Sequence, residues 1–375
     1  MPLSPLSRRS FATALGAGLG ATLLPEPLMS TARADAEPRG PILLNSNENP
    51  YGPSARARAA MTATQSIASR YPDAAEDEVK GALARHHGVA PEQIVLGCGS
   101  GEVLKMADMA FLAAGRTVVV NHPTFEAVID YARVTKAEGV KVPQTADFRH
   151  DLPKMAAACD ARTGLVYVCN PNNPTGTIVS ADELAAFLDR VPKTTTVLVD
   201  EAYHHFVEDP LYASVVPWIA QRPNLVVART FSKIYGLAGM RLGYAIATRE
   251  NAEALRGQSV WSNGNAAVLA AGLASIQDPA HAEQQRSLIN GTKRWLCAEL
   301  SKDGRRYIPS EANFVMIDVG GDVTPVIAAF KERDILVGRK FPTMDNWLRI
   351  SIGTQEEIAA FAQGLREIVP VRRAA

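Results

Sequence analysis

Four short segments of the sequence combine residue types that can carry out chemistry, and each follows an apolar run. They are Gly97–Gly101, Asn170–Gly176, Asp200–Tyr203 and Thr230–Lys233. A glycine-rich turn that opens a helix offers backbone amides to an anion such as a phosphate. A lysine amine can act as a nucleophile or as a base. The set therefore favours a site that holds an anionic group beside a reactive amine.

Apolar, β-branched runs alternate with helical patterns along this part of the chain. The predicted strands are Ile94–Leu96, Thr117–Asn121, Leu165–Cys169, Thr195–Val199, Leu225–Ala228 and Tyr244–Ala247. Runs that are buried on both faces are typical of a largely parallel sheet. Helical patterns at 102–112, 125–134 and 181–189 lie between them and indicate an α/β layer architecture. Ligands bind such sheets at the carboxyl ends of the strands, where the four segments lie.

The lysine lies in the segment RTFSK, which continues as GLAGMRLG up to Gly243. This segment resembles the lysine segment of class I/II aminotransferases. The other matching motifs are NENPYG at 47–52, RYPD at 70–73, NPNNPTG at 170–176, DEAY at 200–203 and LRISIGT at 348–354. Together they most resemble the histidinol-phosphate aminotransferase branch of the fold-type I enzymes that use pyridoxal phosphate (PLP). The resemblance implies PLP as cofactor and transfer of an amino group from an amino acid, or from histidinol phosphate, to a 2-oxo acid such as 2-oxoglutarate.

The resemblance also implies a role for each residue around the cofactor ring. Lys233 would form a Schiff base with PLP and then move a proton at the substrate α-carbon, although alone it would read as a surface lysine. Asp200 would pair with the ring nitrogen and keep the ring electron-poor, although alone it could be a helix N-cap. Tyr203 and Asn173 would hydrogen-bond the phenolic oxygen. Phe125 would stack on the ring.

The cofactor phosphate has its own expected ligands. They are Gly99, Ser100 and Gly101 at the start of a helix, Ser232, and Arg241. Tyr71, in RYPD, resembles a tyrosine that reaches the phosphate bound by the neighbouring subunit. The resemblance therefore implies a homodimer with shared active sites.

The substrate contacts are expected from the C-terminal part of the chain. Arg349 matches the arginine that grips the substrate α-carboxylate, although an arginine on a strand is usually a solvated residue. Tyr51 and Arg339 are further expected substrate contacts. Only Arg339 is available for a substrate phosphate, so the donor stays open between histidinol phosphate and another amino acid.

The pattern of predicted helices and strands changes after about residue 280. A long polar helix is followed by strands at 313–319 and 347–352 and by helices at 325–331 and from 355. These elements predict a small α+β C-terminal domain beside a large α/β domain with a mostly parallel sheet, the fold-type I arrangement. The predicted divisions are an N-terminal arm over 35–70, a large PLP-binding domain over 71–280 and a small domain over 281–375.

The N-terminus carries the pattern of an export signal. SRRSF at 7–11 precedes an apolar stretch at 12–24, and Ala-Arg-Ala at 32–34 suits a cleavage site. The pattern predicts a twin-arginine signal peptide over 1–34, brief contact with the twin-arginine translocation machinery, and a periplasmic or otherwise exported protein. The stretch is short for a transmembrane helix, and an ordinary helix is the alternative. Histidine biosynthesis is cytoplasmic, so export favours a different amino acid as substrate.

Composition and spacing exclude several other classes of protein. The sequence has 39 basic and 39 acidic residues and no basic run, which argues against nucleic-acid binding. The four cysteines form no CxxC pair and are expected to be mostly buried thiols. His204 and His205 are expected on a strand, where neighbouring side chains point to opposite faces, so they predict no metal site and are assigned to tuning the substrate pocket. GCGSGE at 97–102 lacks the glycine order of a dinucleotide site.

Two alternative functions remain open on these residues. A PLP-dependent decarboxylase or carbon-sulfur lyase could use the same scaffold, because fold does not settle the reaction. The other alternative is a non-catalytic protein that binds PLP or a periplasmic ligand. Such a protein would have no need of a reactive amine beside a paired carboxylate.

Overall fold

The computed structural model describes residues 40–370, and residues 41–370 belong to one compact unit. The segment expected to be a signal peptide, residues 1–34, lies outside the described residues. Among residues 40–370, no helix is both long and apolar enough to cross a lipid bilayer.

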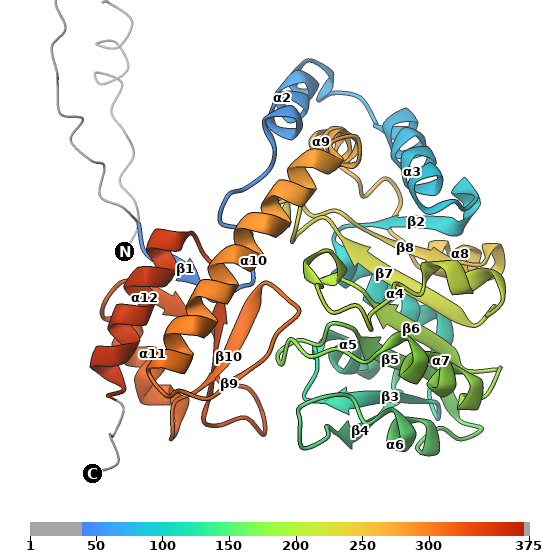
Figure 1. The fold of residues 1–375 in the computed structure, drawn as a ribbon. Helices are drawn as coiled ribbons and strands as arrows, with labels where there is room; N and C mark the ends of the chain where they lie inside the picture. The colour runs from blue at the N-terminus through green and yellow to red at the C-terminus, as the bar shows by residue number, and fades with distance from the viewer. Residues whose placement is uncertain (1–39, 371–375) are drawn as a thin grey trace, which may run out of the picture. The chain divides into compact units, whose positions relative to one another are not determined.

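A seven-stranded sheet forms the centre of the fold, in the order β2-β8-β7-β6-β5-β3-β4 (Figure 1). Its strands are β2 (Ile94–Gly97), β3 (Thr117–His122), β4 (Glu138–Pro143), β5 (Thr163–Cys169), β6 (Thr196–Asp200), β7 (Leu225–Thr230) and β8 (Gly243–Ala247). β8 is antiparallel to both neighbours, and the other pairs are parallel. The six predicted strands are all present to within two residues, and the mostly parallel sheet is confirmed.

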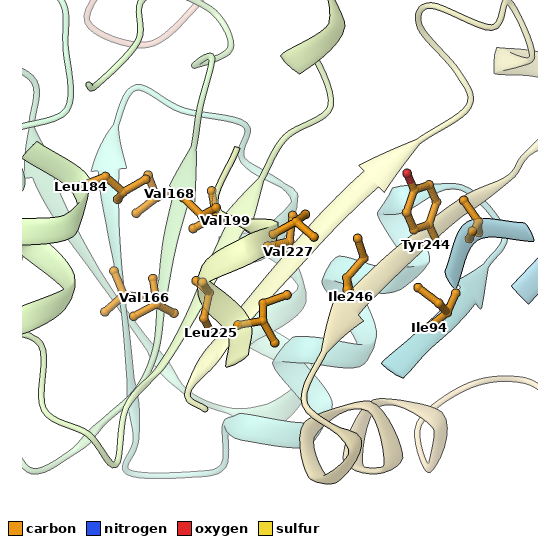
Figure 2. Packing of buried hydrophobic residues seen from close by; sticks show 14 of the residues in the cluster. Ile94, Val166, Val168, Leu184, Val199, Leu225, Val227, Tyr244 and Ile246 are labelled. Carbon is orange, nitrogen blue, oxygen red and sulfur yellow. The ribbon is translucent and has the colours of Figure 1, made fainter. Parts of the chain in front are cut away.

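Helices cover both faces of this sheet. They are α3 (Asp73–His87), α4 (Ser100–Phe111), α5 (Ala127–Thr135), α6 (Leu152–Ala157), α7 (Ala181–Arg190), α8 (Arg249–Arg256) and α9 (Ala266–Ile276). A further helix, α2 (Ala55–Ala63), packs against α9. Side chains alternate between the two faces along each strand. Val166 and Val168 therefore pack toward α7, as Figure 2 shows beside Leu184, whereas Leu165 and Tyr167 pack with α4, α5 and α8. Both faces are buried, which explains why these strands have no polar side.

The C-terminal part contains two smaller sheets and three helices. Its helices are α10 (Pro279–Lys302), α11 (Val323–Lys331) and α12 (Gln355–Ile368), and its strands are β9 (Tyr307–Ile308), β10 (Phe314–Asp318), β11 (Ile335–Val337) and β12 (Trp347–Ser351). β12, β10 and β9 form an antiparallel sheet. β1 (Ile42–Leu44) pairs in parallel with β11, so the beginning of the described chain joins its C-terminal part. The predicted boundary near residue 280 falls at the start of α10, and the division into two domains stays a prediction.

The cysteines differ from one another in burial. Cys169 is buried at the end of β5, Cys159 and Cys297 are half-buried, and all four are free thiols. Cys98 is exposed, because it lies in the turn between β2 and α4. The expectation of mostly buried thiols was therefore wrong for Cys98.

Candidate active site

One pocket of about 810 Å³ lies at the carboxyl ends of β3, β5, β6 and β7. Eleven of the fourteen predicted site residues line it: Ser100, Gly101, Phe125, Asn173, Asp200, Tyr203, Ser232, Lys233, Arg241, Arg339 and Arg349. The antiparallel direction of β8 brings Arg241, two positions before its first residue, to the same edge of the sheet. The topology therefore gathers segments from 100 to 349 around one cavity.

Lys233 presents its amine to this pocket from the segment after β7. Its Nζ donates to the backbone oxygen of Ser46 at 3.3 Å and lies 5.6 Å from the centre of the Tyr203 ring. Burial, together with the positive charge of Arg349, lowers the pKa of the Lys233 amine to about 8. At pH 7 about a tenth of the amine is therefore uncharged, far more than for an ordinary lysine, and the uncharged form is the one that acts as a nucleophile or a base.

Asp200 is a buried carboxyl at the end of β6, with 3% of its surface exposed. Tyr167 donates its hydroxyl to Oδ2 at 2.9 Å, and the Ala202 amide donates to Oδ1 at 3.0 Å. Burial raises the pKa of Asp200 to about 6, and the two hydrogen bonds oppose that rise. The carboxyl is thus held ready to pair with a cationic group in the pocket.

Tyr203 and Arg349 are held by the segment that follows β1. Asn47 Nδ2 donates to the Tyr203 hydroxyl at 3.1 Å. Arg349 donates to Asn173 Oδ1 at 2.7 Å and to the Asn45 oxygen at 2.9 Å. Burial lowers the pKa of Arg349 to about 10, and its buried Nε has no partner within the described chain. A planar carboxylate is the group that such a fork of donors suits best.

An anion cradle forms where β2 turns into α4. Gly99 is the N-cap of α4 with φ 75°, and a Cβ at that position would lie 2.0 Å from Arg241 Nη2. Arg241 itself has a left-handed backbone, φ 68°, and its Nη1 lies 3.5 Å from Ser232 Oγ. Backbone amides at a helix start, a guanidinium and a hydroxyl therefore converge on one end of the pocket.

Two expected residues lie elsewhere in this chain. Tyr51 is outside the pocket, because it packs against the C-terminal hydrophobic core and bonds Thr292. Tyr71 is 83% exposed, in the turn before α3. Its expected role needs a second copy of the chain, so that role stays a prediction.

His204 and His205 do not lie on a strand and do not face the active-site pocket. They belong to a short 3-10 helix, 204–206, with ring centres 3.7 Å apart, and they line a separate pocket with His86 and Tyr235. The assignment of these histidines to tuning the substrate pocket was therefore wrong. Burial and the charge of Arg229 lower the pKa of His205 to about 3, so its ring stays neutral. Within residues 40–370, no cluster of three or more histidine, cysteine or acidic side chains could hold a metal ion.

Several residues that contact predicted site residues escaped prediction. Tyr167 reads as core in the strand pattern, yet its hydroxyl supports Asp200. Asn45 and Asn47 were not singled out, although NENPYG had been noted and begins at Asn47. A tyrosine inside a strand whose neighbour ends in a buried aspartate is the signal that could have found Tyr167, since its hydroxyl needs a partner.

The sequence matches the family model of aminotransferase class I and II over residues 39–365. The chain belongs to this family. A histidinol-phosphate aminotransferase of Moorella thermoacetica is 40% identical over 331 residues, which are 88% of this chain and 85% of that protein. The expected family, fold type and aminotransferase activity are therefore confirmed.

Two solved structures are similar to this aminotransferase. A protein from Erwinia carotovora atroseptica has a TM-score of 0.85 and 34% identity, covering 87% of this chain and 95% of its own. The histidinol-phosphate aminotransferase of Sinorhizobium meliloti, in complex with pyridoxal-5'-phosphate, has a TM-score of 0.82 and 27% identity, covering 88% and 91%. With the family match, the expected PLP cofactor is confirmed.

The pocket residues fit this cofactor in charge and shape. The cradle at Gly99, beside Arg241, suits the phosphate, and a Cβ at position 99 would fill it. Asp200 suits the ring nitrogen, Tyr203 and Asn173 suit the phenolic oxygen, and the Lys233 amine suits the aldehyde.

Proposed function

We propose that this protein is a PLP-dependent aminotransferase that moves an amino group between an amino acid, or histidinol phosphate, and a 2-oxo acid such as 2-oxoglutarate. One observation carries the proposal. The Lys233 amine, the buried Asp200 carboxyl and the Arg349 guanidinium all face a single pocket. The amine suits covalent attachment and proton transfer, the carboxyl suits an electron sink, and the guanidinium suits an α-carboxylate.

Each residue has a distinct task in this reaction. When bound, PLP supplies the electron sink for the pair left on the substrate α-carbon. Lys233 would hold the cofactor through its amine and, once that amine is free, would take the α-proton and return it; its pKa near 8 suits both directions. Asp200 keeps a proton on the ring nitrogen, and Tyr167 keeps Asp200 ionised. Arg349 fixes the carboxylate, so that the α-hydrogen is oriented toward Lys233.

The donor is either histidinol phosphate or another amino acid. Relatives named for histidinol phosphate at 35–40% identity support the first choice. An ion pair supports the second choice, another amino acid. Arg339 is the one arginine expected to bind a substrate phosphate, and its guanidinium already pairs with Glu126. Specificity follows from which pocket groups are left unpaired by the wrong substrate.

A donor screen with the purified holoprotein tests the reaction. Each candidate donor is incubated with 2-oxoglutarate, and the formation of glutamate is measured together with the visible absorbance of bound PLP. Lys233→Ala should lose at least about 100-fold in turnover, because it removes both the covalent link and the base. Release of carbon dioxide or of a thiol in place of glutamate would identify a decarboxylase or a lyase. Turnover that survived in Lys233→Ala would refute the assignment.

Two further parts of the proposal concern assembly and location. We propose a homodimer in which Tyr71, exposed in the single chain, reaches the phosphate bound by the second copy. Light scattering should give twice the chain mass, and Tyr71→Phe should weaken PLP binding.

We also propose export to the periplasm through the twin-arginine pathway, on the basis of Arg8 and Arg9. Replacing both arginines with lysine should leave the protein in the cytoplasmic fraction.

A further inference from the structure

The pocket contains an ion pair that transamination itself does not use. Arg339 Nη2 lies 2.5 Å from Glu126 Oε2. Arg339 follows β11 and lines the pocket, whereas Glu126 follows the pocket residue Phe125 after β3. The pair joins segments that are 213 positions apart in the sequence.

The Glu126 carboxylate has an alternative partner that it does not take. Glu126 is the N-cap residue of α5, where a carboxylate could accept from the free amides of the first turn. Its side chain accepts no such bond and reaches Arg339 instead. Glu126 is 35% exposed and Arg339 56% exposed. The carboxylate therefore neutralises the cation at the edge of the substrate pocket.

The two arginines of this region share an aromatic ring. The guanidinium carbon of Arg339 lies 4.4 Å from the centre of the Phe341 ring, and that of Arg349 lies 4.8 Å from it. The charge of Arg339 also contributes to lowering the pKa of Arg349. Of these two cations, Arg339 has a carboxylate partner, whereas Arg349 bonds only amide and backbone oxygens.

We propose that Glu126 determines substrate specificity by occupying Arg339, so that the pocket favours substrates whose distal group is uncharged over substrates whose distal group is anionic. An anionic distal group must displace Glu126 from Arg339 and meets the repulsion of its carboxylate. An uncharged group leaves the pair intact and meets no such repulsion. This inference rests on the proposed aminotransferase function and names the class of amino donor that the pocket favours; an acceptor such as 2-oxoglutarate, whose distal group is anionic, must still displace Glu126.

Glutamate and glutamine provide the test, because they have nearly the same shape and differ in distal charge. Each is reacted with the PLP holoprotein in a single half-reaction, without a 2-oxo acid, and the second-order rate constant is measured from the change in visible absorbance. Glu126→Gln should raise the glutamate-to-glutamine ratio about fivefold, equivalent to about 1 kcal/mol. The gain should come from glutamate alone and disappear in the double variant with Arg339→Gln. Glu138→Gln is the matched control, since Glu138 pairs with Arg162 at 3.6 Å on the exposed edge strand β4.

Binding without turnover gives a second measurement. Calorimetry of the holoprotein should show succinate binding about fivefold tighter in Glu126→Gln, with butyrate binding unchanged. An active variant whose glutamate-to-glutamine ratio and succinate affinity both stay within 1.5-fold of the parent, on the order of 0.2 kcal/mol, overturns the inference. A fall in melting temperature with no change in either would identify the pair as a structural link only. If no amino acid changes the absorbance of the parent protein, the proposed function fails instead, while the succinate measurement still decides the role of Glu126.

Discussion

Asp200 depends on Tyr167 to stay ionised inside the protein. Tyr167 is fully buried, and its hydroxyl is one of two donors to the carboxyl, whose pKa is about 6. Tyr167→Phe keeps the ring and removes that donor. A hydrogen bond to a charged group contributes about 1.5–3 kcal/mol, and about 1.4 kcal/mol corresponds to one pKa unit. We therefore expect the pKa of Asp200 to rise to between about 7 and 8.

The consequence is a pH-dependent loss of cofactor affinity. Only the ionised carboxyl pairs with the ring nitrogen, so affinity falls as the pH drops through the pKa of Asp200. Titration of the stripped protein with PLP at pH 6.5 should give a dissociation constant about tenfold weaker in Tyr167→Phe, with the difference vanishing above about pH 9. Tyr244→Phe is the matched control, because it removes a buried hydroxyl that lies 3.0 Å from His87 and does not touch Asp200. A difference that stays constant with pH, or grows at high pH, would refute the reasoning.

Two further variants test how much the buried Asp200 carboxylate destabilises the folded protein and whether the phosphate cradle needs a glycine at position 99. Burial raises the pKa of Asp200 from 3.8 to about 6, so the folded state loses about 3 kcal/mol as the pH rises between these values. In denaturant unfolding without cofactor, Asp200→Asn should raise the free energy of unfolding by up to that amount at pH 7.5 and by almost nothing near pH 4. The variant should also lose transamination. Equal gains in the free energy of unfolding at both pH values would contradict this. Gly99→Ala places a Cβ 2.0 Å from Arg241 Nη2 and should weaken PLP binding by at least about tenfold, or about 1.4 kcal/mol. Gly291→Ala, which meets nothing within 4 Å, should bind PLP as the parent does, and unchanged binding by Gly99→Ala would disprove the cradle.

The sequence predicted the central strands well because their burial dictates their composition. Val197 and Val199 face one side of the sheet and Leu198 faces the other, so an apolar run is required on both. β4 was not predicted, because as an edge strand it exposes Glu138 and Lys141 and carries no such run. The direction of β8 was also beyond prediction, since strand direction depends on connections and leaves little trace in composition.

The candidate site was predictable where a residue's role lies in its own motif. Lys233, Asp200 and Arg241 each stand in a recognisable segment, and all three line the pocket. Residues that act through a partner were missed, because the partner is remote: Tyr167 lies 33 positions from Asp200, and Glu126 lies 213 positions from Arg339. Periodicity describes the face on which a side chain lies, whereas these pairings depend on how distant segments meet.

The pairing of β1 with β11 has a consequence for synthesis of the chain. Residues 45–47, just after β1, hold Lys233, Tyr203 and Arg349, and Asn45 and Arg349 are 304 positions apart. The first of these segments leaves the ribosome long before the last is translated. A nascent chain halted near residue 330 would contain Lys233, Asp200 and the phosphate cradle but would lack both the partner strand of β1 and the arginine for the substrate carboxylate. Such a chain could hold the cofactor before it could select a substrate, and closure of the site must wait for the slow pairing of distant segments.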